Sequence, residues 1–187
     1  MTGSAAANAQ STKRTGSLPL YTPEERARRD ASPWTAVQGV LAPLQFLVFL
    51  ISLALVARYL LTGEGLGAAT WSVVIKTLVL YTIMITGAIW EKQVFGRYLF
   101  APSFFWEDVF SMLVLALHTA YLVAVFADLL SAKGQMILAL AAYATYVVNA
   151  AQFIWKLRQA RLEGDQKDAR SSSPDGPESN LSLEVVR

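Results

Sequence analysis

The segment that decides the fold is residues 35–57, TAVQGVLAPLQFLVFLISLALVA. It is 23 residues long and carries no charge, whereas a helix needs only about 20 apolar residues to cross a bilayer. Three further apolar segments follow, at about residues 71–90, 109–127 and 134–155. The sequence therefore predicts an all-α, polytopic membrane protein with a bundle of four transmembrane helices.

The composition agrees with this prediction. Hydrophobic residues make up 54% of the 187-residue chain and charged residues only 16%, whereas about 25% of a soluble domain is charged. The net charge of +2 is small, and no basic run is interleaved with aromatic residues, so nucleic-acid binding is not expected. The chain has no cysteine, which excludes disulfides, thiolate metal ligands and cysteine nucleophiles.

The regions outside the apolar segments are polar. Residues 1–20 and the tail 161–187 are predicted to be disordered, because they are rich in small and polar residues. Thr22, Pro23 and Glu25 form the pattern of a helix N-cap, a proline at the first helical position and a capping-box glutamate. This pattern predicts a short N-terminal interfacial helix, placed at the start of a transmembrane domain that covers residues 21–160.

The distribution of basic residues predicts the orientation. The N-terminal arm, the loop between the second and third apolar segments, and the C-terminal tail hold 13 of the 16 Lys and Arg residues. Cytoplasmic loops of membrane proteins carry the excess of positive charge. Both termini and the 91–105 loop are therefore predicted to lie in the cytoplasm.

Each apolar segment carries polar residues on one face or at one end. Because a polar side chain in a bilayer usually faces the bundle interior or a cavity, these residues are predicted to line a cavity open to the cytoplasmic side, with aromatic walls that include Trp90, Phe105 and Trp106. The only histidine lies 11 residues beyond Glu107, or about 16 Å deeper. The polar residues concerned are Gln38, Gln45, Glu91, Glu107, Asp108, Ser111, His118, Asn149 and Gln152.

Simpler structural interpretations exist for most of these residues. Glu91, Lys92 and Arg97, near Glu107 and Asp108, could form an interfacial ion-pair cluster without any chemistry. Gln and Asn side chains often hold membrane helices together, and a lone intramembrane histidine is more often a packing partner than a ligand. Lys76 is most simply a residue whose ammonium group snorkels to the outer boundary of the membrane.

Long runs of this sequence carry a family resemblance. The runs are Tyr21–Ser32, Val37–Phe46, Ile89–Lys92, Leu99–Pro102, Phe104–Ser111 and Ala116–His118. They resemble the signature stretches of the 3-vinyl bacteriochlorophyllide hydratase family of photosynthetic bacteria. The resemblance covers roughly residues 21–160, which is nearly all of the membrane part, and leaves out the two tails.

The resemblance implies a hydro-lyase of bacteriochlorophyll a biosynthesis in the bacterial inner membrane, either cytoplasmic or intracytoplasmic. Such an enzyme would add water in the Markovnikov sense to the 3-vinyl group of a magnesium chlorin or bacteriochlorin, giving a 1-hydroxyethyl group. The reaction needs no redox cofactor and no metal of the protein's own. The expected partners are this substrate, membrane lipid and neighbouring pigment-biosynthesis enzymes.

Matching that chemistry to the residues gives hypotheses for individual roles. Glu107 is the first choice for the acid, because a carboxyl group among aromatic rings is desolvated and favours its protonated form. Glu91 or Asp108 could share the proton or take it back from the attacking water, which Ser111, Asn149 and Gln45 could position. His118 could ligate the substrate's magnesium or bond a ring substituent, and Arg26, Arg28, Arg29 or Lys156 could pair with its propionate. The other residues expected to bind substrate are Gln38, Trp90, Phe105, Trp106 and Gln152.

Two other classes of function remain open from the sequence alone. A non-enzymatic pigment carrier or photosystem assembly factor would use the same slot but would not need a desolvated acid. A small transporter or a haem- or quinone-binding subunit is a second alternative. The single histidine argues against bis-histidine haem ligation within one chain.

Overall fold

The computed structural model describes residues 20–171, and within that range it contains five helices and no strand. The helices are α1 (Pro23–Ala31), α2 (Pro33–Thr62), α3 (Leu66–Phe95), α4 (Phe105–Phe126) and α5 (Ala132–Ser171). Four of them, α2 to α5, are long and apolar enough to cross a membrane. The predicted all-α fold with four membrane helices is therefore confirmed.

The short helix α1 begins where the sequence predicts. The Thr22 hydroxyl accepts a hydrogen bond from the Glu25 N–H at 3.2 Å, and the Glu25 carboxylate accepts one from the Thr22 N–H at 2.8 Å. This reciprocal capping box satisfies two backbone donors that a helix start otherwise leaves unpaired. Pro23 occupies the first helical position, where a missing N–H costs nothing.

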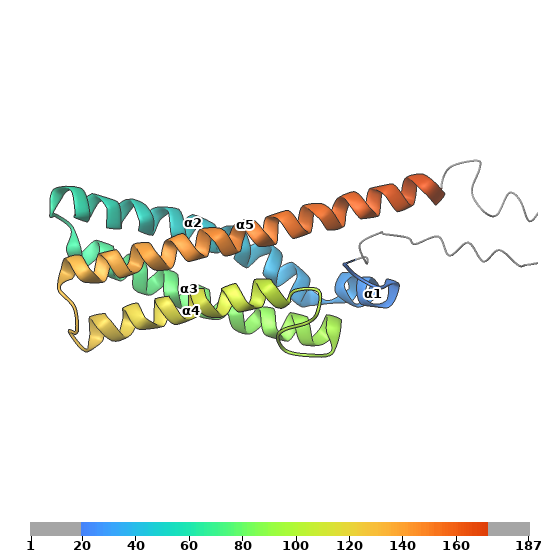
Figure 1. Cartoon of the computed structure of the whole chain (residues 1–187), viewed down its shortest axis with the longest axis horizontal. Helices are drawn as coiled ribbons and strands as arrows, with labels where there is room; N and C mark the ends of the chain where they lie inside the picture. Colours follow the sequence, from blue (N-terminus) through green and yellow to red (C-terminus); the bar gives the residue numbers. More distant parts are fainter. Residues whose placement is uncertain (1–19, 172–187) are drawn as a thin grey trace, which may run out of the picture.

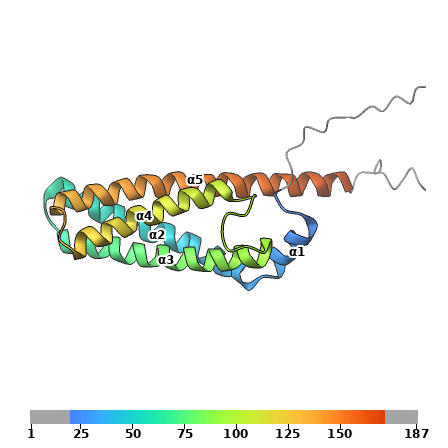
Figure 2. The same ribbon diagram turned by 60° about the horizontal axis from the view of Figure 1, so that its bottom comes forward.

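The four long helices form two hairpins. Figures 1 and 2 show them running side by side along one axis, with α1 at the end where α3 and α4 are joined. Helix α2 packs mainly on α3, and α4 packs mainly on α5, whereas contacts between these two hairpins are sparser. Gly63, with a φ angle of 77°, ends α2 in the left-handed conformation and allows the tight turn into α3.

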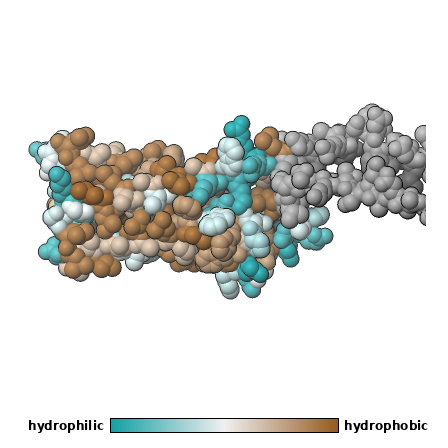
Figure 3. Space-filling model, viewed as in Figure 1, coloured by the Kyte–Doolittle hydropathy of each residue, from teal (hydrophilic) through white to brown (hydrophobic). Residues whose placement is uncertain are grey.

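The surface divides into an apolar belt and polar ends. In Figure 3 hydrophobic side chains cover most of the bundle, while hydrophilic ones gather at the end that carries α1. Large apolar side chains such as Val40, Leu47, Ile85 and Ile154 are exposed on this belt, each by more than half. Soluble proteins rarely expose such a large apolar surface to water, whereas lipid would cover it. The four apolar helices indicate a multi-pass membrane protein.

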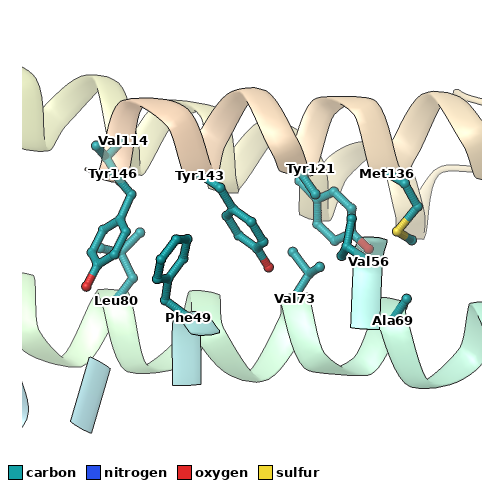
Figure 4. Close-up of a cluster of buried hydrophobic side chains, with 11 residues drawn as sticks. Phe49, Val56, Ala69, Val73, Leu80, Val114, Tyr121, Met136, Tyr143 and Tyr146 are labelled. Atoms are coloured by element: carbon teal, nitrogen blue, oxygen red, sulfur yellow. The ribbon is translucent and has the colours of Figure 1, made fainter. Parts of the chain in front are cut away.

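The main core lies between the two hairpins. Figure 4 shows Phe49 and Val73 from α2 and α3 facing Tyr143 and Tyr146 from α5. The ring of Phe49 lies 5.4 Å from that of Tyr143 and 4.9 Å from that of Tyr146, measured between centroids. A second, smaller cluster at the α1 end includes Tyr21, Trp90, Phe95, Phe104 and Phe153. It packs the N-terminal segment against the end of α3 and the middle of α5.

Helix α5 extends further than composition suggests. The sequence places a disordered tail at residues 161–187, but α5 remains helical to Ser171. Residues 156–171 are dominated by Lys, Arg, Glu, Gln, Leu and Ala, which are good helix formers. The disorder expected for residues 1–19 and 172–187 lies outside the described residues.

The expected snorkelling of Lys76 is wrong. Its side chain is fully buried, and its Nζ atom lies 4.2 Å from the centroid of the Tyr146 ring and 5.5 Å from that of Tyr143. Helix α3 begins at Leu66, ten residues before Lys76, so this residue lies about 15 Å inside the helix rather than near its end. The face of α3 that carries Lys76 is turned toward the bundle interior.

Candidate active site

Three carboxylates meet at the end of the bundle that carries α1. Glu91 lies in the last turns of α3, and Glu107 and Asp108 lie in the first turn of α4. The connecting loop, residues 96–104, folds back so that all three carboxylates are buried, with exposed fractions of 4%, 8% and 7% respectively. The sequence-based expectation that these acids lie near the same end of the bundle therefore agrees with their observed positions.

Two of the carboxylates hold this loop. The Ala101 N–H donates to the Glu91 carboxylate at 2.6 Å, and the Phe100 N–H donates to the Asp108 carboxylate at 2.7 Å. Phe100 has a φ angle of 60°, a left-handed conformation that costs free energy for a bulky residue. The hydrogen bond from Phe100 to Asp108 helps to stabilise this conformation.

The alternative interpretation, an ion-pair cluster of Glu91 with Lys92 and Arg97, is not what the structure shows. Within the described residues, neither basic side chain forms a salt bridge with a carboxylate. Lys92 instead donates to the Gly96 carbonyl at 2.8 Å and lies over the Tyr98 ring.

Removal of the Asp108 carboxylate gives a first prediction. Asp108→Ala leaves the Phe100 N–H without its acceptor in a partly buried position, so the free energy of unfolding should fall by about 1–3 kcal/mol. Thermal unfolding in detergent, followed by circular dichroism, measures the change. Glu64→Ala, at an exposed position in the turn between α2 and α3, is the matched control and should leave the midpoint unchanged. Equal midpoints for both variants would contradict an anchoring role for Asp108.

Glu107 has a different partner. Its Oε2 atom accepts a hydrogen bond from the Lys156 ammonium at 2.7 Å, which joins α4 to α5 in a salt bridge. The Lys156 Nζ atom also lies 4.9 Å from the centroid of the Phe104 ring. The sequence-based expectation was an acid packed among aromatic rings, with Lys156 near the same membrane surface. The structure adds that the Lys156 ammonium bonds that acid directly.

The Glu107–Lys156 pair borders a cleft on the surface of α4 and α5. The cleft has a volume of about 460 Å³, within the usual range for small-molecule sites. Its other lining residues all lie on α5 and are Val148, Ala151, Gln152, Trp155 and Gln159. The cleft therefore combines an apolar wall with one ion pair and two amides.

A second polar pair lies one helical turn deeper. The Asn149 amide donates to the Ser111 hydroxyl at 2.9 Å, again joining α4 to α5. Ser111 is four residues beyond Glu107, about 6 Å along the helix. The amide oxygens of Asn149 and Gln152 are buried and have no hydrogen-bond partner among the described residues. These oxygens are acceptors available to a water molecule beside the ion pair.

Several predicted site residues do not line this cleft. Gln38 donates to the Thr86 hydroxyl at 2.8 Å, and the Trp90 indole donates to the Thr35 hydroxyl at 2.9 Å. Both contacts hold α2 against α3. Arg29 pairs with Asp30 and lies over the ring of Tyr21, within the N-terminal segment. These three residues have structural partners, and none of them lines the cleft.

The expected aromatic walls also need correction. The side chains of Phe105 and Trp106 are 44% and 67% exposed, and they contact each other rather than the cleft. In the first turn of α4, the inward positions are taken by Glu107 and Asp108, so the two preceding residues fall on the outer face. Trp155 is the aromatic side chain that lines the cleft instead.

Gln45 and His118 lie deeper still. Both are buried, and both have side-chain atoms without a hydrogen-bond partner among the described residues. The His118 Nδ1 atom lies 2.8 Å from the Val114 carbonyl oxygen. Glu107 and His118 are about 16 Å apart along α4, so His118 belongs to a separate layer of the core.

Gln152 was expected to bind substrate and does line the cleft. The lining residues that sequence reasoning missed share one helix face. Val148, Ala151, Trp155 and Gln159 recur at intervals of three or four residues, which is the spacing of one face of a helix. Gln159 lay beyond the expected end of the fourth span. The face itself could have been found from this periodicity.

The fold and the site show which class of protein this is. It is a multi-pass membrane protein with an ion pair of a carboxylate and an amine at a surface cleft. The chain belongs to the 2-vinyl bacteriochlorophyllide hydratase family, whose model matches residues 21–159. The family resemblance seen in the sequence is thereby confirmed.

Two relatives carry the same description. A 2-vinyl bacteriochlorophyllide hydratase of Rhodobacter capsulatus is 70% identical over 150 residues, which cover 80% of this chain and 87% of the relative. One of Cereibacter sphaeroides is 71% identical over 145 residues, which cover 77% and 89% respectively. No solved structure matches this chain.

Proposed function

We propose that this chain adds water to the vinyl group of a bacteriochlorophyllide at the cleft beside Glu107 and Lys156. The chain is a hydro-lyase of bacteriochlorophyll biosynthesis, as its membership of the hydratase family and about 70% identity to two named hydratases indicate. The observation that carries the choice of site is the ion pair itself, because it places a carboxylate 2.7 Å from a lysine ammonium beside a cleft with an apolar wall.

The reaction requires one proton transfer in each direction. A proton is added to the terminal vinyl carbon, forming a C–H bond and leaving a cation on the carbon attached to the macrocycle. The macrocycle delocalises this charge, and water then attacks the cationic carbon to form the C–O bond. The water loses a proton, so the net change is the addition of one water molecule without oxidation or reduction.

The Glu107–Lys156 pair can supply and recover that proton. The Lys156 ammonium donates a hydrogen bond to the Glu107 carboxylate at 2.7 Å, and a proton transferred along this bond would make Glu107 the acid. Glu107 then donates the proton to the vinyl carbon, and its carboxylate stabilises the adjacent cation electrostatically. The proton released by the attacking water returns the pair to its starting state.

The attacking water lies, in this proposal, between the ion pair and the Ser111–Asn149 pair. The free amide oxygens of Asn149 and Gln152 would accept its hydrogen atoms and direct its oxygen toward the substrate. Glu91 and Asp108 act indirectly, because they hold loop 96–104 and the first turn of α4. We assign His118 no part in holding the substrate, because its distance from Glu107 is too great for a shared pose.

The substrate's macrocycle would lie flat against the α5 wall formed by Val148, Ala151 and Trp155. We place both termini in the cytoplasm of a bacterium, on the side of its cytoplasmic or intracytoplasmic membrane where most basic residues gather. An amphipathic pigment could then enter the cleft laterally from the lipid. The same membrane would hold the neighbouring enzymes that make the substrate and use the product.

Trp155 provides a prediction about binding. Trp155→Ala should raise the KM for the vinyl pigment by about 2- to 12-fold with little change in kcat, because stacking contributes about 0.5–1.5 kcal/mol. Trp106→Ala is the matched control, since this tryptophan is equally exposed but lies outside the cleft. A larger KM increase for Trp106→Ala than for Trp155→Ala would place the macrocycle on the other face.

The activity is tested by supplying the purified chain, in detergent, with a vinyl bacteriochlorophyllide or chlorophyllide. The expected product is heavier by one water molecule and has lost its vinyl conjugation, which shifts its absorption to shorter wavelength. Pigment that binds but is recovered unchanged would instead support a carrier.

A further inference from the structure

The bundle interior contains polar atoms that the reaction does not use. Among the described residues, the Lys76 Nζ atom, the His118 Nε2 atom and the Tyr121 hydroxyl are buried without a hydrogen-bond partner. All three residues have an exposed fraction of 0%. A buried polar atom that stays unpaired is costly in free energy, so several of them in one region indicate a ligand that the protein has to accommodate.

Lys76 and His118 both lie close to the ring of the same tyrosine, Tyr143. The Lys76 Nζ atom is 5.5 Å from the centroid of the Tyr143 ring, and the His118 ring centroid is 5.9 Å from it. The Tyr143 hydroxyl is already bonded to the Ser52 hydroxyl at 2.5 Å, which in turn contacts that of Ser72 at 2.7 Å. Among the described residues, neither Lys76 Nζ nor His118 Nε2 bonds this hydroxyl. Figure 4 shows Tyr143 between the two hairpins.

The two side chains have opposite requirements. The His118 Nδ1 atom faces the Val114 carbonyl, which only accepts hydrogen bonds, so Nδ1 carries the hydrogen and Nε2 is an acceptor. The lysine ammonium only donates. An anion would satisfy Lys76 but not His118, and a cation would do the reverse. A water molecule both accepts and donates, and it is small enough for a core packed with Phe49, Val114 and Tyr146.

We propose that Lys76 and His118 hold internal water in the middle of the membrane bundle. Gln45 extends the site toward the carboxylates, because it lies one helical turn from Phe49 in that direction and neither atom of its amide has a partner. The opposite end is closed by the fully buried apolar side chains of Val56, Ala69 and Met136.

The single histidine makes this proposal directly measurable. In protein labelled with ¹⁵N-histidine and embedded in lipid bilayers, the described core contributes one imidazole, and the sequence contains no other. Water-edited solid-state NMR should show rapid polarisation transfer from water to the ring Nε2, although His118 has no exposed surface. The methyl groups of Val114, equally buried but apolar, serve as the dry reference. Transfer to Nε2 as slow as to those methyl groups would overturn the proposal.

A pair of neighbouring variants tests the role of Lys76. Lys76→Met keeps the length of the side chain but removes the donor, so the rapid water contact of His118 should be lost. Thr77→Val is the matched control, because Thr77 is equally buried on the same helix but already bonds the Val73 carbonyl at 2.8 Å. Undiminished transfer in a folded Lys76→Met protein would show that Lys76 does not hold the water. If this variant fails to fold, the wild-type measurement still shows whether the water is present. Neither measurement depends on hydratase activity.

Discussion

Glu107→Gln is expected to lower the hydration rate by about 10²- to 10⁴-fold, the usual contribution of a positioned general acid. Glutamine has nearly the same shape as glutamate, and its amide oxygen can still accept a hydrogen bond from Lys156. It cannot take up a proton from the lysine and pass it to carbon. The rate is measured as kcat with a vinyl bacteriochlorophyllide, from the loss of vinyl absorption.

Two controls separate chemistry from binding and folding in this variant. Glu64→Gln makes the same change at an exposed position in the turn between α2 and α3, and should retain the full rate. Fluorescence titration should show that Glu107→Gln still binds the pigment with an affinity close to that of the wild type. A normal rate in Glu107→Gln would show that another group donates the proton.

Lys156→Met is expected to cause a loss of at least about 10²-fold, because the proton of the pair starts on the lysine. It should also lower the unfolding temperature, since the salt bridge joins α4 to α5 and its loss leaves a buried carboxylate without a partner. The double variant Glu107→Gln/Lys156→Met should be no slower than the slower single variant. Residues that act as one unit show this lack of additivity.

Additive losses in the double variant would contradict this account. They would mean that the two residues act in separate steps. A thermal scan of each variant, run beside the rate measurement, shows whether a lost rate reflects unfolding instead.

The membrane fold could be predicted because its signal is local. Segment 35–57 is uncharged and long enough to span a bilayer by itself, and Thr22 and Glu25 meet within one helical turn. No local signal shows how deep Lys76 lies in the membrane. Its predicted depth depended on where α3 begins. The glycine-rich turn before Leu66 gave no sharp boundary, so Lys76 was predicted closer to the membrane surface than it is.

The site could be predicted only in part, and for a similar reason. The cluster of Glu91, Glu107 and Asp108 follows from the orientation of the spans and a short loop. The partners of each acid come from tertiary structure, because Glu107 and Lys156 are 49 residues apart and Asp108 binds a loop amide. Phe105 and Trp106 were placed wrongly because apolar residues cover both the inner and the outer faces of a membrane helix, so hydrophobicity does not tell one face from the other.

Lys156→Arg tests the central claim, a transferable proton held by the ion pair, most directly. Arginine keeps the positive charge and can bond the Glu107 carboxylate, but its guanidinium group does not give up a proton in proteins. The measurement is kcat for the folded Lys156→Arg protein, with pigment binding confirmed by titration. The account predicts binding with a rate about as low as that of Lys156→Met. A rate near that of the wild type would contradict it, because a positive charge beside Glu107 would then be enough.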